Sequence, residues 1–147
     1  AARARDRIAA AGFSNAEIRL CDAQVEPFPE NGREAIISRF GVMFFADPVA
    51  AFANLARALS PGGRMTFAAW GPLEGNPWFR IPFIAATTRL GRPPKTDRNA
   101  PGPLAFHDRE RVLGLMAQAG LAEPEASAVD LRLTPAGSTQ DAAALLT

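Results

Sequence analysis

The sequence predicts an α/β fold built on a parallel sheet, and three observations support this. A short apolar run at 35–38 is typical of a strand, and "DPVAAFANLARALS" at 47–60 has apolar residues at helical spacing. Pro61-Gly62-Gly63 is a stop signal, after which "RMTFAAW" resumes with strand-like residues. Strand, helix, stop and strand with short connections indicate two parallel strands joined by a right-handed crossover.

The composition is that of one globular domain. The 147 residues are enough to bury a core, and 48% hydrophobic with 21% charged residues argues against global disorder. The net charge of +1 gives no reason to expect nucleic acid or an acidic membrane surface as the main partner. Cys21 is the single cysteine, which excludes a disulfide framework and fits a cytoplasmic compartment. No apolar run approaches the roughly 18 residues of a membrane span.

The first third of the chain is predicted to hold a helix, a strand and a loop before the second strand. Residues 1–11 mix Ala and Arg in a helical pattern. Ile18 and Leu20 alternate with polar residues, which predicts a strand over 17–22. "VEPFPENGR" contains two prolines and an Asn-Gly pair, so it is predicted to be a loop. The run at 35–38 then suits a strand buried on both faces.

The central helix carries both of its start signals. Asp47 suits the N-cap position, and Pro48 suits the first helical position. One stripe of apolar side chains is expected to face the core: Val49, Phe52, Leu55, Ala56 and Leu59.

The second half of the chain begins with a Pro/Gly-rich insertion at 71–106, which surrounds one short helix candidate at about 78–90. An insertion of this length is more often functional or mobile than a plain connection. "HDRERVLGLMAQAGL" then predicts an amphipathic helix. Its expected inward residues are Val112, Leu113, Leu115 and Met116. The alternation at 129–133 predicts a further strand, and Ser138 precedes a short Ala/Leu run of helical character.

Two polar segments follow predicted strands, at the edge of the sheet where open α/β folds bind ligands. Asp22-Ala23 follows the first strand, and its carboxylate suits a hydrogen bond from a ligand amine or, equally, a simple turn. The segment 38–41 ends the next strand. Ser38 suits a ligand hydrogen bond and Gly41 a close backbone approach, or the segment is only a strand-to-helix loop.

The remaining candidates are weaker. His107 is the only histidine and has no Cys, Asp or Glu at ligand spacing, so we expect a surface or capping role and no metal site. Trp70, Trp78 and Phe79 flank the insertion and either wall a substrate pocket or belong to the core. The sequence contains no G-x-G-x-x-G, no phosphate-binding P-loop and no G-x-S-x-G nucleophile motif.

Three stretches carry a family resemblance: "RLCDAQVEPFP", "AIISRFGVMFFADPVAAFANLARALSPGGRMTFAAW" and "FHDRERVLGLMAQAGL". They resemble class I S-adenosylmethionine-dependent methyltransferases, in particular the small-molecule group whose best-known members methylate quinone precursors. The resemblance implies a Rossmann-like three-layer α/β sandwich, S-adenosylmethionine as cofactor and a small-molecule methyl acceptor. It also implies that residues 1–147 are the carboxyl-side portion of one methyltransferase domain, with 71–106 as a substrate-side insertion.

The resemblance also implies roles for four residues. Asp22 looks like the family's acidic residue that accepts from the adenine amino group, with Ala23 donating its backbone N–H to the ring. Ser38 matches the residue whose backbone lies beside the methionine part of the cofactor. Arg39 begins the loop that borders cofactor and substrate. No residue of this sequence is assigned as a catalytic base.

The sequence departs from the family pattern in two places. Arg33-Glu34 stands where the family has Phe-Asp, and the charge of Arg33 needs an outlet to solvent. The family's Gly-rich first loop and ribose-binding acid find no match, so we expect the first two strands to be absent. The last strand is expected to be absent too, because the sequence ends in a region of helical character before such a strand is found. Such a segment by itself is expected to leave sheet edges unpaired and to bind S-adenosylmethionine weakly or not at all. Two alternatives stay open: a truncated nicotinamide-dependent oxidoreductase and a non-catalytic α/β interaction module.

Overall fold

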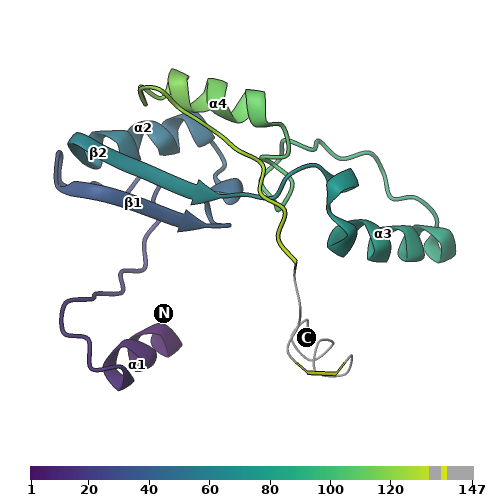
Figure 1. The fold of residues 1–147 in the computed structure, drawn as a ribbon, viewed down its shortest axis with the longest axis horizontal. Coiled ribbons are helices and arrows are strands. Elements are labelled where there is room, and N and C mark those ends of the chain that lie inside the picture. Colours follow the sequence, from purple (N-terminus) through teal and green to yellow (C-terminus); the bar gives the residue numbers. More distant parts are fainter. Residues whose placement is uncertain (133–136, 139–147) are drawn as a thin grey trace.

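The computed structural model describes residues 1–132 and 137–138 of the chain. Figure 1 shows their arrangement, with a small sheet, α2 and α4 packed on it, and both α1 and α3 set apart from it. The elements in chain order are α1 (Ala2–Ala10), β1 (Arg33–Arg39), η1 (Val42–Phe44), α2 (Pro48–Ala58), β2 (Leu59–Ala68), η2 (Leu73–Gly75), α3 (Pro77–Leu90) and α4 (Arg109–Gln118). The Ala/Leu run after Ser138 lies outside the described residues.

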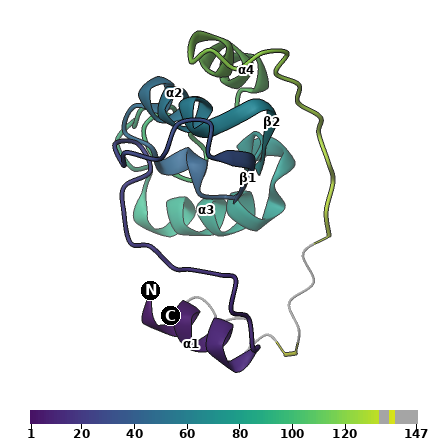
Figure 2. The ribbon, with the colours of Figure 1, turned by 90° about the vertical axis from the view of Figure 1, so that its left-hand side faces the viewer.

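The two strands are parallel neighbours joined by α2, which confirms the predicted α/β class. In the ladder, Ile36 is opposite Met65 and Ser38 is opposite Phe67. Both α2 and α4 cover the same face of the sheet (Figures 1 and 2). Because the strands are parallel, their carboxyl ends meet at one edge, which is where the chain continues into η1 and η2.

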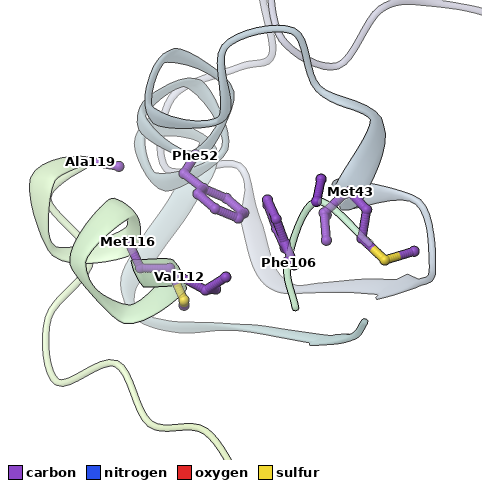
Figure 3. Close-up of a cluster of buried hydrophobic side chains, with 8 residues drawn as sticks. Met43, Phe52, Phe106, Val112, Met116 and Ala119 are labelled. Atoms are coloured by element: carbon purple, nitrogen blue, oxygen red, sulfur yellow. The ribbon is translucent and has the colours of Figure 1, made fainter. Parts of the chain in front are cut away.

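The core lies between this covered face and the two helices, and Phe52 stands at its centre (Figure 3). Its side chain is 0% exposed. The ring centroid lies 5.7 Å from that of Phe67 and 5.9 Å from that of Phe106. Val112 and Met116 of α4 belong to the same cluster of buried side chains. The core is therefore aromatic at its centre and closed by α4.

Helical periodicity predicted the inward faces of both helices well. In α2, Phe52 and Leu55 are buried and Val49 is half-buried. In α4, Val112 and Met116 are buried, while the two predicted inward leucines are half-buried. The start signal of α2 is confirmed too, because Pro48 opens the helix and the residue before it is the N-cap.

The prediction that 35–38 is buried on both faces is wrong for one face. Ile36 and Ser38 are half-buried on the covered side, whereas Ile37 is 83% exposed. Thr66, the ladder partner of Ile37, is exposed as well. Successive side chains of a strand point to opposite faces, and within the described residues helices cover only one of them. Along β1 only Ile36 and Ser38 are therefore partly shielded from solvent.

No strand forms at 17–22 or at 129–132, so both of these predictions are wrong. Leu20 is 87% exposed and Leu131 is 74% exposed. A strand completes its backbone hydrogen bonds only against a neighbour, and neither segment meets a free edge of the sheet in the described structure. Residue 133, the last of the second predicted strand, lies outside the described residues.

The Pro-Gly-Gly step lies inside β2 and not before it. The helix ends at Ala58 and the strand begins with the next residue. Residues 60–63 lie opposite the single residue Glu34 of β1, which makes a local bulge. A Cβ on Gly63 would lie 2.8 Å from the carbonyl oxygen of Ser60, so the chain approaches itself too closely there for any other residue. The glycine thus serves the strand pairing, and the prediction that Pro61-Gly62-Gly63 stops the helix is wrong, because α2 ends before this step.

The insertion at 71–106 contains the predicted helix, α3, which begins at Pro77. Figure 1 shows α3 beyond the carboxyl ends of both strands, away from α2 and α4. None of its side chains is fully buried. The helix of the insertion therefore lies past the edge of the sheet at which the predicted site residues were sought, whereas the end of the insertion returns to the core with Ala105 and Phe106.

Candidate functional site

The carboxyl edge of the sheet is formed by the last residues of β1 and the segment after β2. Ser38 is half-buried there and Arg39 is exposed. The backbone N–H of Phe40 donates to the carbonyl oxygen of Ala68 at 3.0 Å, so the ladder continues one residue beyond β1. The backbone N–H of Trp70 lies 3.4 Å from the sulfur of Met43. These contacts hold the two strand ends together.

Phe40 adopts a backbone conformation that is uncommon for its residue type. Its φ is +59°, in the left-handed region that favours glycine. The ring stacks on Trp70 with 4.5 Å between centroids and 13° between planes, which helps to hold this turn. A Cβ on Gly41 would lie 3.2 Å from Oγ of Ser38, so the serine hydroxyl sits directly against the glycine backbone. Strained turns of this kind concentrate at functional sites.

The second predicted segment, Asp22-Ala23, lies in a tight turn. Oδ1 of Asp22 accepts from the backbone N–H of Gln24 at 2.9 Å, and its carbonyl oxygen accepts from Val25 and Glu26 at 3.1 and 2.9 Å. Asp22 therefore has the turn-forming role that its residue type allows. Its side chain is also exposed, whereas Ala23 is half-buried.

This turn is attached to the start of α2. Oε1 of Gln24 accepts from the backbone N–H of Asp47 at 2.9 Å. Asp47 in turn caps the helix, because its Oδ1 accepts from the backbone N–H of Ala50 at 3.0 Å. In a strand–helix–strand unit the helix begins on the side where the first strand ends. The structure thus brings Asp22-Ala23 and the end of β1 to the same side of the unit, although Asp22 does not follow a strand as the sequence predicted.

From there the loop runs along α2 towards the start of β1. Side-chain Nδ2 of Asn54 donates to the carbonyl oxygens of Ala23 and Glu26 at 3.0 and 2.9 Å. Farther along, the backbone N–H of Asn31 donates to the carbonyl oxygen of Arg57 at 3.1 Å. Sequence reasoning did not single out Asn54. The signal for it was a lone amide side chain within the apolar run "VAAFANLARAL".

An apolar hollow of about 470 Å³ lies beside the carboxyl end of β2. Phe79 packs edge-on against Trp70 with 5.1 Å between ring centroids, while Trp78 is 43% exposed. The hollow is lined by Trp70, Gly75, Asn76, Pro77, Trp78, Ile81, Pro82 and Leu131. Of the aromatic candidates, Trp70 and Trp78 thus line a pocket, and Phe79 supports it.

The other candidates add no chemistry to this edge. His107 precedes the N-cap of α4, and its Nδ1 is bonded to the carbonyl oxygen of Leu104 at 2.8 Å. Among the described residues no group of His, Cys, Asp and Glu is arranged to hold a metal ion. Arg33 is exposed, so its charge has the outlet that its position requires. No helix in the described part of the chain is long and apolar enough to cross a membrane.

Residues 1–67 match the family model of a methyltransferase domain. A ubiquinone/menaquinone biosynthesis C-methyltransferase of Paraburkholderia phymatum is 29% identical over 80% of this chain and 51% of its own length. Its namesake in Cupriavidus taiwanensis is 34% identical over 48% of this chain and 30% of its own length. That of Teredinibacter turnerae is 39% identical over 42% and 25%, respectively.

The chain spans about half the length, or less, of these curated relatives. The family match covers the turn at Asp22, all of β1 and α2, and most of β2. The part of the carboxyl edge that β1 supplies, with Ser38 and Arg39, therefore lies within the matched region, whereas Trp70 and the hollow lie beyond it. The match of residues 1–67 to a methyltransferase-domain model and the similarity to these C-methyltransferases agree with the resemblance found in the sequence.

Proposed function

We propose that the protein carrying this chain transfers a methyl group from S-adenosylmethionine to a small-molecule acceptor. The observation that carries the proposal is the attachment of the Asp22 turn to the start of α2. It brings an exposed carboxylate to the side of the fold where β1 ends in the strained turn at Phe40. Ligands of open α/β sheets bind beyond the carboxyl ends of the strands.

The residues at this edge fit the two ends of the cofactor. The exposed carboxylate of Asp22 would accept from the adenine amino group, and the backbone N–H of Ala23 would donate to the ring. Ser38 and Arg39, at the end of β1, would lie beside the methionine part. When bound, S-adenosylmethionine supplies a methyl group on a sulfonium, whose leaving group is already activated. The task of the protein residues is then to bind, orient and exclude water.

We assign the acceptor side to the insertion at 71–106. The hollow lined by Trp70 and Trp78 lies next to the end of β2 and is mainly apolar. Aromatic walls suit a flat, apolar acceptor, because stacking and burial both favour it. The relatives named above are C-methyltransferases of quinone biosynthesis, and their name is in keeping with an acceptor of this chemistry.

The test is calorimetric titration of the full-length protein with S-adenosylhomocysteine, the product form of the cofactor. Asp22→Asn retains the side-chain oxygen that accepts from Gln24 but loses the negative charge. Because hydrogen bonds to charged groups contribute about 1.5–3 kcal/mol, we expect an affinity loss of roughly 10- to 100-fold.

Glu125→Gln, a charge-neutralising change at another exposed carboxylate, is the matched control and should bind as the wild type does. A full-length protein that does not bind S-adenosylhomocysteine would contradict the proposed function. Wild-type binding that Asp22→Asn leaves unchanged would contradict the adenine assignment alone.

A further inference from the structure

Asn54 is the one buried side chain of polar or charged type among the described residues, at 8% exposure. It lies on α2 between the core residues Phe52 and Leu55. Its hydrogen-bonding capacity is used on both sides. Nδ2 donates to two loop carbonyls, those of Ala23 and Glu26, and Oδ1 accepts from Nη2 of Arg57 at 2.6 Å. A buried amide of this kind costs free energy unless it is fully paired, so its partners explain its presence.

The two carbonyl groups that accept from Asn54 belong to the two ends of one turn. Ala23 directly follows Asp22, and Glu26 closes the turn by donating its backbone N–H to the carbonyl oxygen of Asp22. The surrounding loop, from residue 13 to residue 32, contains no helix or strand that would hold the turn in place. The amide of Asn54 therefore bridges both ends of the segment that presents Asp22 and ties them to the rigid helix.

The geometry points to Asn54 as a positioning residue for the cofactor: we propose that its two N–H donors fix the turn 22–26 so that Asp22 and Ala23 face the nucleoside. This inference rests on the proposed function. Asn54 acts through the carbonyls of Ala23 and Glu26. Without the donors the turn samples other positions, and the apparent affinity for the nucleoside falls by the fraction of time spent away from the competent one.

A second hydrogen bond between the turn and α2 limits how much affinity is lost when the Asn54 donors are removed. Oε1 of Gln24 accepts from the backbone N–H of Asp47 independently of Asn54, so the turn stays near α2 when the side-chain amide of Asn54 is lost. We therefore expect a variant at Asn54 to fold with a mobile turn. A competent population reduced to about one tenth corresponds to an affinity reduced about tenfold.

The experiment compares Asn54→Asp with the wild type in the full-length protein. Aspartate has the shape of asparagine and still accepts from Arg57, but it lacks both donors and would turn a carboxylate towards two carbonyl oxygens. Hydrogen exchange is read at the backbone amides of Val25 and Glu26, and S-adenosylhomocysteine affinity is measured by calorimetry. We expect exchange at least tenfold faster, an affinity about tenfold lower and an unchanged KM for the acceptor.

Val112→Ala is the control for a general loss of stability, because Val112 is buried in α4 and has no contact with the turn among the described hydrogen bonds. It should lower Tm without changing exchange at Val25 and Glu26 or the affinity. If Asn54→Asp does not fold, Asn54→Gln, with the same donors on a longer arm, gives the same readings with smaller shifts.

Three results would overturn the inference. Exchange at Val25 and Glu26 that stays at the wild-type rate would show that Asn54 does not hold the turn. Faster exchange with an affinity no lower than in the control would show a structural role only. A wild type that fails to bind S-adenosylhomocysteine would remove the proposed function itself, and with it the role of Asn54.

Discussion

The replacement Phe52→Ala tests whether the core centred on this ring supports the whole strand–helix–strand unit. Phe52 is 0% exposed, and its ring lies against Phe45, Phe67 and Phe106, with 6.3, 5.7 and 5.9 Å between centroids. Truncation of a fully buried Phe costs about 3–5 kcal/mol, which combines lost transfer free energy and the cavity left behind. Domains of this size are stable by only about 5–15 kcal/mol. Phe52→Ala should therefore remove a large share of the free energy of unfolding.

The assay is urea-induced unfolding of the full-length protein, followed by far-UV circular dichroism. Phe83→Ala is the matched control, since Phe83 lies on α3 and is 46% exposed. We expect the control to lose about 1 kcal/mol or less of unfolding free energy, because a half-exposed ring leaves little cavity. A loss below about 2 kcal/mol for Phe52→Ala would refute the reasoning, since it would mean that the site collapses or that the ring is not central to the core.

Two further predictions concern the strand pairing and the acceptor pocket. Gly63→Ala should lower the free energy of unfolding by about 1–3 kcal/mol, because the added Cβ would meet backbone oxygens at 2.8–3.2 Å. Gly75→Ala, where nothing lies within 4 Å, should be close to neutral in the same urea titration. Trp78→Ala should raise the KM for an apolar acceptor at least several-fold without changing S-adenosylhomocysteine affinity, whereas Leu90→Ala, at an exposed position of the same helix outside the hollow, should change neither. An unchanged KM in Trp78→Ala would contradict the assignment of the hollow to the acceptor.

The sequence by itself determined those features that depend on near neighbours in the chain. Asp47 and Pro48 start α2 because the N-cap contact reaches only to residue 50, and helical spacing alone placed Phe52 and Leu55 on the buried face. The parallel pairing of β1 and β2 also followed, because a short crossover helix between two strands leaves almost no other arrangement.

Only the tertiary structure decided the features that depend on distant partners. Leu20 alternates as in a strand yet stays out of the sheet, and Ile37 lies in a strand yet faces solvent. Whether a residue pairs in the sheet depends on a free backbone edge next to it, and whether its side chain is buried depends on a layer that covers that face. The same holds for the site. Asp22 could be named from the sequence, but its attachment through Asn54 joins residues about thirty positions apart. No local pattern encodes these hydrogen bonds, since they form only when the loop packs along α2 in the folded protein.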